Sequence, residues 1–463
     1  MKVALVNTNR MKPAIAPIGL DYLAEATSAA GHQVDILDLC WSDDLSADIA
    51  RFFNEAEYRL VGITLRNTDD CGFTSRQSFL SEFSEIVKSI RKHTNATLVI
   101  GGVGFSTMPE AILEICEADL GIKGEGEFAF PELANRIESN REFADLPNLV
   151  LVQNQVLNPA SFGHLERLPA MSRSWVDNTR YFKEGGQAGF ETKRGCSGRC
   201  IYCADPVAKG KGIRVRTPKS VVDELKNLLD MGIDHLHTCD SEFNLPDWHA
   251  FQVCDEIINR KLADRLRWYA YCTPHKFSDE LARRMYSAGC IGINFGVDNG
   301  DDNMLRSLKR DFTASDIINT ARSCKKAGII TMFDLLIGAP GETKESIART
   351  IEVMKQAEPD RVGVSVGVRV YPGTELSRQL EGKIDNDNLT EPAFFLEPSI
   401  ADIVFELLDK LIGDDERFLF FDPSKAEKNY NYNANQILVD AIKEGYRGAY
   451  WDILRKYKKE TYR

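Results

Sequence analysis

The chain has 463 residues, which is too long for one ordinary domain and predicts about three. Its hydrophobic content of 43% and charged content of 27% are typical of soluble globular proteins. The formal net charge of −12 argues against a nucleic-acid partner, and no apolar run approaches the roughly 20 residues that span a bilayer. The first residues, MKVALVNTN, enter a strand without a secretory signal pattern. We therefore expect a cytoplasmic protein whose 11 cysteines are thiols or metal ligands.

Residues 1–145 alternate strand and helix patterns. Continuous Val/Ile/Leu runs separated by amphipathic stretches indicate a doubly wound, Rossmann-like parallel sheet. The expected strands are 2–7, 33–39, 60–65, 96–102 and 120–126, and the expected helices are 17–30, 75–92 and 109–117. Because ligands of such sheets bind at the carboxyl ends of the strands, the residues that follow the strands are the candidate binding residues.

Unusual residues follow three of these strands. Glycine at a strand end lets a bulky ligand approach the backbone closely. Ordinary strand-to-helix turns also use glycine, so each group alone leaves both interpretations open. The candidate ligand-binding residues are Arg66 and Asn67, then Gly102, Val103 and Gly104, then Gly124, Glu125 and Gly126.

The pattern weakens over residues 146–187, which we interpret as a linker that contains a small hairpin. Three of the aromatic residues there are candidates for contacts, Trp175, Tyr181 and Phe182. Aromatic side chains in a linker either line a substrate cavity or pack against two domains, and packing is the more common use. We expect these three to pack between domains.

From residue 188 to residue 375, strand patterns again alternate with helical stretches. Six such units predict a partial (β/α)6 version of the TIM barrel, so that the fold class is α/β throughout. Catalytic residues of such barrels lie at the carboxyl ends of the strands. The expected strands are 188–194, 235–240, 266–272, 291–297, 330–338 and 361–368.

The loop after the first of these strands contains CSGRCIYC, with Cys196, Cys200 and Cys203 in the spacing C-x3-C-x2-C. Three thiolates can hold three irons of a 4Fe-4S cluster and leave the fourth iron open. A structural zinc site would need four ligands, usually as two short pairs, and no fourth Cys or His lies close by. The loop is polar, which disfavours three unconnected core thiols. The motif therefore favours a 4Fe-4S cluster.

This motif resembles the signature of the radical S-adenosylmethionine (SAM) superfamily, which implies that SAM binds the open iron. The resemblance places SAM contacts at the strand ends. Carboxylates after the second strand would accept hydrogen bonds from the ammonium group of SAM, although a helix N-cap explains them equally well. GVDNG resembles the family segment Gly-x-Glu-Ser-Gly, with an aspartate that would contact the ribose, and a later arginine would pair with the SAM carboxylate. The candidate SAM-binding residues are Tyr202, Asp240, Glu242, Asp298, Arg310 and Ile337.

The residues at the edge of the first sheet, together with APIGLDYLAEATSAAGHQVDILD, resemble the cobalamin-binding domain of one large branch of radical SAM enzymes. The chain departs from many corrinoid domains because it lacks their Asp-x-His-x-x-Gly motif. His32 is expected only to cap a turn. The resemblance therefore implies that Arg66 or its neighbours approach the lower face of the cobalt.

Residues 376–463 combine helical patterns with many acidic and aromatic residues and are expected to form a helical C-terminal cap over the barrel mouth. Their aromatic residues either touch the substrate or pack within the cap. The four considered are Tyr430, Tyr432, Tyr446 and Trp451. No cysteine follows Cys324, so we expect no auxiliary iron–sulfur domain.

The resemblance implies a cobalamin-dependent radical SAM C-methyltransferase that moves a methyl group from methylcobalamin to an unactivated carbon. We expect the substrate to be a peptide or protein side chain, with a small natural product as the other candidate. A one-electron reductant such as a ferredoxin or flavodoxin would be its redox partner. Tyr and His side chains receive no catalytic role, because hydrogen abstraction by a radical needs no general base.

Three alternatives remain open. The first keeps both cofactors but catalyses a non-methylating rearrangement or cyclisation. The second is a methylthiotransferase, which needs a second three-cysteine cluster in the N-terminal domain. Cys40, Cys71 and Cys116 occur there, but Cys40 and Cys116 lie in apolar patterns typical of core residues. The third is a non-catalytic corrinoid sensor.

Overall fold

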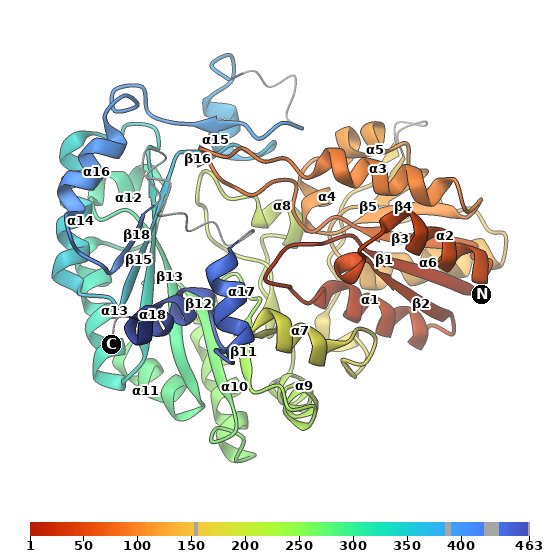
Figure 1. Ribbon diagram of the computed structural model, residues 1–463, viewed down its shortest axis with the longest axis horizontal. Coiled ribbons are helices and arrows are strands. Elements are labelled where there is room, and N and C mark those ends of the chain that lie inside the picture. The colour runs from red at the N-terminus through yellow and green to blue at the C-terminus, as the bar shows by residue number, and fades with distance from the viewer. Residues whose placement is uncertain (152–155, 385–389, 421–434, 462–463) are drawn as a thin grey trace.

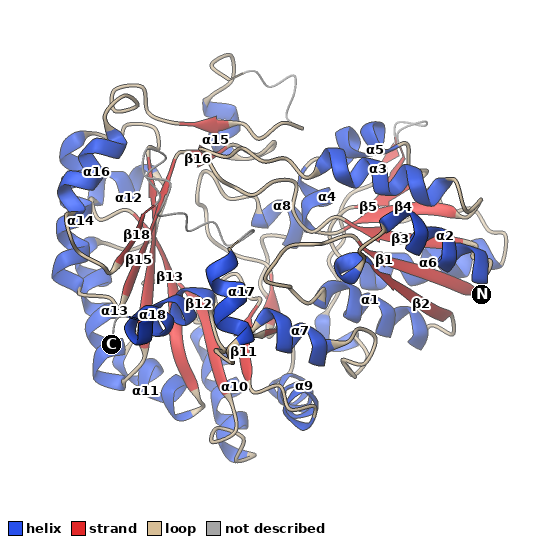
Figure 2. Cartoon of the chain, in the orientation of Figure 1, coloured by secondary structure: helices blue, strands red, loops and turns tan. Residues whose placement is uncertain are grey.

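The computed structural model describes residues 1–151, 156–384, 390–420 and 435–461. The chain forms two lobes that lie side by side (Figure 1). The N-terminal lobe contains one parallel sheet flanked by helices, and the larger lobe contains a second parallel sheet with helices on its outer side (Figure 2). Both sheets were predicted from the continuous apolar runs.

The N-terminal sheet has the strand order β2-β1-β3-β4-β5-β6-β7, in which the first five strands are parallel. The last two strands form an antiparallel hairpin against β5. The strands are β1 (Lys2–Asn7), β2 (Gln33–Asp38), β3 (Leu60–Thr64), β4 (Thr97–Gly101), β5 (Leu120–Ile122), β6 (Leu149–Leu151) and β7 (Val156–Leu157). The hairpin predicted near residue 150 therefore extends this sheet.

Helices cover both faces of the N-terminal sheet, because the strands are apolar on both sides. α1 (Ile18–Ala29) and α6 (Gly126–Glu138) pack together over one face, around Leu5 and Phe130. The other face is covered by α2 (Leu45–Glu55), α3 (Leu80–Arg91) and α5 (Pro109–Cys116). The short elements η1 (Leu39–Trp41) and α4 (Val103–Thr107) follow β2 and β4.

The second sheet has the order β18-β15-β14-β13-β12-β11-β8, and every pairing in it is parallel. Among the described residues the two end strands do not pair with each other, so the barrel is open. Its strands are β8 (Ala188–Phe190), β11 (His235–Thr238), β12 (Arg267–Cys272), β13 (Cys290–Asp298), β14 (Ile330–Ile337), β15 (Arg361–Val366) and β18 (Phe418–Phe420). Six of them were predicted, and β18 adds a seventh from the segment expected to be a helical cap.

Helices cover the outer face of this sheet and bury one continuous apolar core with it. They are α9 (Pro218–Asp230), α10 (Asp247–Asn259), α11 (Asp279–Ser287), α13 (Ala314–Ala327), α14 (Lys344–Ala357) and α16 (Val404–Ile412). Shorter elements join the main ones. They are η2 (Leu165–Arg167), α7 (Asn178–Gly185), β9 (Lys193–Arg194), α8 (Asp205–Lys209), β10 (Arg214–Val215), α12 (Asp302–Ser307), β16 (Val368–Arg369), α15 (Glu375–Gln379) and β17 (Phe394–Phe395).

The C-terminal helices α17 (Gln436–Lys443) and α18 (Tyr450–Thr461) pack against each other, and α17 also packs on α7. Trp451 of α18 is 3% exposed and forms an apolar cluster with Tyr269, Met332 and Leu419. Trp451 is therefore a packing residue on the inner side of the barrel sheet. Tyr446 packs edge-on against Tyr457, whereas Tyr430 and Tyr432 lie outside the described residues.

Several buried polar contacts hold the lobes together, among them Arg194–Glu127 at 2.6 Å, and two of them lie towards the ends of the barrel sheet. Near β8, Glu224 of α9 accepts hydrogen bonds from Tyr22 of α1 at 2.8 Å, Arg173 at 2.8 Å and Arg216 at 2.5 Å. Beyond β15, Arg369 pairs with Asp69, which follows β3. The N-terminal lobe is thus anchored close to both ends of the open barrel sheet.

The linker aromatic residues divide between the lobes, as predicted: Tyr181 and Trp175 pack on the N-terminal lobe, and Phe182 packs against the barrel core. Tyr181 is fully buried and shares hydrogen bonds with Asp38 and Asn7, and the Trp175 indole N–H donates to Glu25 at 3.1 Å. His32 is also buried, with Nε2 3.1 Å from Asn135 Oδ1. None of the helices in the described part of the chain has the length and hydropathy needed for a bilayer span.

Candidate active site

The cysteine loop lies between β9 and α8. Its turn begins at Gly195, whose φ of +86° and close approach to the carbonyl of Gly212 exclude a side chain. Two groups donate to the sulfurs: the Gly198 N–H to Cys196 Sγ at 3.3 Å, and Arg310 Nη1 to Cys200 Sγ at 2.9 Å. Donors of this kind stabilise thiolates, which are the form that binds iron.

The thiols of this loop are half-buried. Burial raises the pKa of Cys203 to about 12, and the nearby Asp205 adds to the effect, so a metal must displace a proton to bind there. Among the described residues, no three Cys, His, Asp or Glu side chains converge on one mononuclear metal position. A cubane does not require such convergence, because each thiolate binds a different iron.

Arg310 connects the cysteine loop to the end of β13. Its Nε lies 3.2 Å from Asp298 Oδ2, and its Nη2 donates to the carbonyl of Gly296 at 2.5 Å. Asp298 also accepts a 2.5 Å hydrogen bond from the hydroxyl of Tyr202. Three of the residues predicted to bind SAM thus form one group beside Cys200.

Asp298 has a backbone φ of +63°, and the register of β13 shifts between Gly296 and Asp298. A non-glycine residue in this left-handed region costs about 1–3 kcal/mol and is enriched at functional sites. The bulge turns the Asp298 carboxylate towards Arg310 and Tyr202. The end of β13 therefore adopts a conformation that positions the Asp298 side chain, at the expense of regular strand pairing.

The two carboxylates predicted after β11 have different surroundings. Asp240 is 2% exposed, and its oxygens accept from the Thr192 N–H at 2.8 Å, the Thr192 hydroxyl at 2.6 Å and the Lys193 N–H at 3.2 Å. Asp240 therefore fixes the corner that leads into the cysteine loop. Glu242 is half-buried, and burial raises its pKa to about 8, opposed by Arg310. Ile337, at the end of β14, is fully buried.

The carboxyl edge of the N-terminal sheet faces the barrel. Burial lowers the pKa of Arg66, whose neighbours include Tyr450 of α18 and Tyr271 of β12. Its Nη1 lies 3.5 Å from the sulfur of Met11. Val103 is 47% exposed at the same edge. An exposed apolar side chain and a half-buried guanidinium at a strand-end edge fit a large, partly apolar ligand.

The glycines at this edge mainly allow close packing between segments of the protein's own backbone. A side chain at Gly102 would meet the carbonyl of Leu65 at 2.5 Å, and one at Gly104 would meet the Asn67 backbone at 3.0 Å. These two glycines let the segment after β3 lie across β4. Glu125 is ion-paired to Arg214 at 2.6 Å. It follows Gly124, at φ +84°, and precedes Gly126, the first residue of α6.

The three other N-terminal cysteines do not come together. Cys40 and Cys116 are buried in two different apolar clusters, as predicted. Cys71 is exposed in the turn after β3, where its sulfur lies 3.4 Å from the Tyr371 hydroxyl. This arrangement gives no second three-cysteine site.

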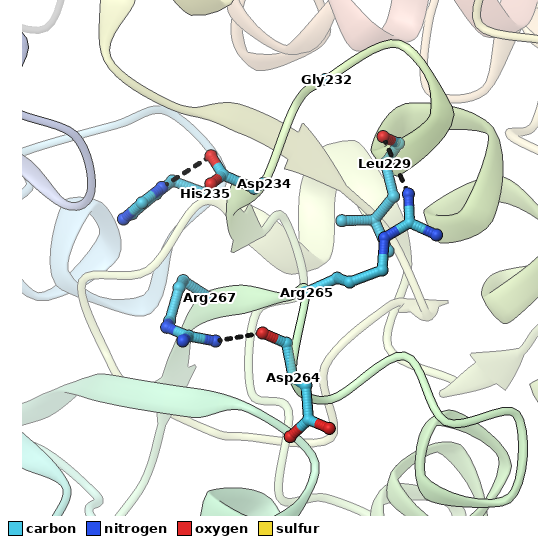
Figure 3. A pocket seen from close by; sticks show the side chains of 7 residues that line it. All are labelled: Leu229, Gly232, Asp234, His235, Asp264, Arg265 and Arg267. Carbon is cyan, nitrogen blue, oxygen red and sulfur yellow. Dashed lines mark hydrogen bonds and ion pairs between the residues drawn. The ribbon is translucent and has the colours of Figure 1, made fainter.

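A solvent-open pocket lies at the other end of the barrel strands. It is lined by Leu229, Gly232, Asp234, His235, Asp264, Arg265 and Arg267, which precede or begin β11 and β12 (Figure 3). Both arginines of the pocket already donate hydrogen bonds to backbone carbonyls: Arg265 donates to Leu229 and Arg267 to Asp264. The pocket is separate from the cysteine loop, which lies at the carboxyl ends.

Comparison with known proteins agrees with the two lobes. The B12 binding domain family matches residues 5–134, and the Radical SAM superfamily matches residues 190–354. A tryptophan 2-C-methyltransferase from Streptomyces laurentii is 33% identical over 449 residues, which cover 83% of this chain and 75% of that protein. The chain belongs to the cobalamin-dependent radical SAM methyltransferases.

Solved structures of relatives support the assignment of this chain to the cobalamin-dependent radical SAM methyltransferases. TsrM from Kitasatospora setae, a radical SAM methyltransferase with tryptophan and a SAM analogue bound, matches with a TM-score of 0.92 at 29% identity, covering 100% of this chain and 98% of that chain. A second TsrM structure, with cobalamin and a [4Fe-4S] cluster, matches with a TM-score of 0.89. The cofactors of the methyltransferase are therefore a 4Fe-4S cluster, SAM and cobalamin.

The cobalamin-dependent radical SAM enzyme OxsB shares the fold of this methyltransferase at lower identity. It matches with a TM-score of 0.73 at 16% identity, covering 86% of this chain and 64% of that chain. The pairing of a corrin-binding lobe with an open SAM barrel is thus common to both proteins.

Proposed function

We propose that this methyltransferase transfers a methyl group from cobalamin to a carbon atom of a small aromatic molecule, for which tryptophan is the first candidate. The observation that carries the proposal is the extent of the similarity to a tryptophan 2-C-methyltransferase, which runs through both lobes. A small-molecule acceptor replaces the peptide or protein side chain expected from the sequence, because the methyltransferases that match this chain over both lobes are named for, or bound to, tryptophan.

The chain's own residues would divide the work as follows. Cys196, Cys200 and Cys203 would hold the cluster, with Arg310 and the Gly198 N–H donating to their sulfurs. Tyr202, Asp298 and Arg310 would contact SAM, because they form one connected polar group beside the cysteine loop.

Glu242 and Ile337 would complete the SAM site, while Asp240 would act through its hold on Thr192. On the opposite lobe, Arg66 and Val103 would contact cobalamin directly. The other candidate residues of that edge would shape the loops around cobalamin. They are Asn67, Gly102, Gly104, Gly124, Glu125 and Gly126.

When bound, the cluster and SAM supply the adenosyl chemistry and cobalamin supplies the methyl group. The protein's contribution is to bind the acceptor between the lobes, to orient it and to exclude water. The anchors at Glu224 and Asp69 serve this purpose, because they hold the N-terminal edge against the barrel.

An anaerobic incubation tests the proposal. Reconstituted protein receives a one-electron reductant, SAM with a deuterated methyl group, and tryptophan. We expect a product that carries the labelled methyl group on carbon, scored by mass spectrometry. An unlabelled rearranged product would instead favour the non-methylating alternative, and a labelled methylthio group would favour a methylthiotransferase.

Measuring 5′-deoxyadenosine in the same samples tests the expected radical path. Hydrogen abstraction predicts one 5′-deoxyadenosine for each methylated product. A methylated product without 5′-deoxyadenosine would overturn the radical path but keep the methyltransferase. If no SAM is consumed with any aromatic acceptor, the proposed function is wrong.

A further inference from the structure

The inner face of the barrel sheet contains a polar layer below the SAM-binding group. Strand alternation places His237 of β11, Tyr271 of β12, Asn294 of β13 and Asp334 of β14 on this face, because the alternate residues of the same strands pack in the outer core. The layer lies above the floor formed by Trp451, Tyr269 and Met332. None of these four side chains belongs to the groups proposed to hold the cluster, SAM or cobalamin.

Asp334 is a carboxylate without a matching cation. Among the described residues its only hydrogen-bond donor is Asn294 Nδ2, at a long 3.5 Å from Oδ2. The other charged group that acts on it is Asp298, which is also acidic. Asp334 is half-buried, and a carboxylate that is partly removed from water without a counter-charge is costly unless a donor or a cation meets it.

Glycines on both neighbouring strands make room for this carboxylate. Asp334 is in register with Gly296 of β13 and with Gly363 of β15. A methyl group at Gly363 would lie 2.8 Å from Asp334 Oδ1, so the carboxylate occupies the place of a side chain. At Gly296 a methyl group would meet only Arg310, at 3.5 Å. The space directly beside Gly296 is therefore filled by no other side chain on the way to Arg310 of the SAM-binding group.

A hydrogen bond from Trp451 fixes the orientation of the Asn294 side chain. The indole N–H of Trp451 donates to Asn294 Oδ1 at 2.6 Å, which leaves Nδ2 to face Asp334. The cap helix α18 thus sets one wall of the layer.

Tyr271 offers an aromatic surface on β12, in register with Asn294 of β13, which lies between Tyr271 and Asp334. Its side chain is 45% exposed, although surrounding protein raises its pKa to about 12. The exposed part of this side chain lies on the inner face of the barrel sheet, because Ala270 and Cys272 of the same strand pack in the outer core. The ring packs at 4.7 Å from that of His237. Its other charged neighbours are Asp334 and Arg66, so Tyr271 lies between the acid of the barrel and the candidate cobalamin contact.

We propose that Asp334 binds the ammonium group of the methyl acceptor while Tyr271 packs against its ring, so that the acceptor is an aromatic primary amine. This proposal rests on the proposed function, in which a small aromatic molecule lies between the lobes. A carboxylate supplies the charge-assisted hydrogen bonds that an ammonium group needs, and an aromatic face packs well on a planar ring. The amine anchors the molecule at the barrel wall and leaves the ring on the side of Arg66.

Binding measurements on the protein with its cluster and cobalamin, but without SAM, test this proposal without turnover. The probes are tryptophan, tryptamine and 3-ethylindole, of which the last matches tryptamine but lacks the amine. We expect the two amines to bind about tenfold or more tightly than 3-ethylindole, since 3-ethylindole would leave the half-buried Asp334 carboxylate without a donor. In Asp334→Asn this preference should disappear. Tyr271→Leu should weaken both indoles, whereas Tyr271→Phe should not.

Asp264→Asn is the matched control, because it removes an exposed acid at the other end of the strands and should change no affinity. Equal binding of tryptamine and 3-ethylindole to the unaltered protein would overturn the proposal even if Asp334→Asn failed to fold. So would amine binding that survives in a folded Asp334→Asn protein, or the absence of amine binding altogether. Amine binding that depends on Asp334 without a methylated product would instead overturn the proposed function alone.

Discussion

Arg369 donates two hydrogen bonds, of 3.0 Å from Nε and 2.8 Å from Nη2, to the same carboxylate oxygen of Asp69. The residues are 300 positions apart in the chain, and both side chains are buried, at 6% and 1% exposure. Asp69 follows β3 of the N-terminal lobe, and Arg369 ends β16 beyond the barrel. This ion pair is therefore a direct link between the two cofactor-binding lobes.

Asp69→Asn should destabilise the protein by about 3–5 kcal/mol, because it leaves the Arg369 guanidinium buried without its counter-charge. Chemical denaturation with a fluorescence readout measures this change. Lys325→Gln, which breaks the exposed pair between Lys325 and Glu358, is the control and should leave the denaturation midpoint unchanged. Equal midpoints for Asp69→Asn and the unaltered protein would contradict the structural role of the pair.

Replacing Cys196, Cys200 and Cys203 together by alanine should remove the iron, about four atoms per chain, because we propose that these three thiolates bind the cluster. Cobalamin content should not change, since the other lobe holds it. Iron and cobalt analysis of anaerobically purified protein measures both. Single changes of Cys40, Cys71 or Cys116 to alanine should keep all the iron. About eight irons in the unaltered protein would instead indicate a second cluster.

Arg310→Lys should weaken SAM binding by about tenfold or more, because an ammonium group cannot reproduce the fork of a guanidinium towards a carboxylate. Calorimetric titration of the cluster-loaded protein with SAM measures this loss. Arg306→Lys changes an exposed arginine on the neighbouring α12 and should have no effect. Undiminished SAM affinity in Arg310→Lys would remove Arg310 from the site.

Amine binding should depend on pH through Asp334. Burial raises the pKa of Asp334 to about 7, Asn294 opposes the shift and Asp298 adds to it. The groups that face it are thus Asn294 and Asp298 of β13 and Tyr271 of β12. Its carboxylate is ionised above this pKa and neutral below it, so tryptamine affinity should fall about tenfold from pH 8 to pH 6.

Two variants assign this pH dependence. Asp334→Asn should give a flat profile, because the titrating group is gone. Glu242→Gln should keep the slope, although the pKa of Glu242, raised to about 8 by burial, lies in the same range. A slope that disappears in Glu242→Gln and survives in Asp334→Asn would show that the wrong carboxylate was chosen.

Most of the fold was predictable from local patterns. Continuous apolar runs indicated both parallel sheets, and the spacing of Cys196, Cys200 and Cys203 indicated the cluster loop. The strand β18 was not predicted, because its three residues lie among helical patterns and its pairing with β15 bridges more than fifty residues. Such a short strand is defined by its partner and not by its own sequence.

The polar layer of the barrel was also not visible in the sequence. Asp334 lies within the apolar run ITMFDLLIG, and only the alternation of inner and outer residues shows that it faces the interior. Asp240 illustrates the opposite problem. It stands at a strand end, where a ligand was expected, but its oxygens hold Thr192, which lies 48 positions earlier. Contacts over that separation follow from the topology and not from the local pattern.

The open barrel is bounded on both sides by contacts to the other lobe, at Glu224 near β8 and at Arg369 beyond β15. The N-terminal lobe therefore covers the side on which the barrel sheet remains open. Chimeras that combine this barrel with a foreign corrin-binding half will need the equivalents of both Tyr22 and Asp69. With either one missing, the foreign half would lose one of the buried contacts that hold it against the barrel, and the two lobes would pack less firmly.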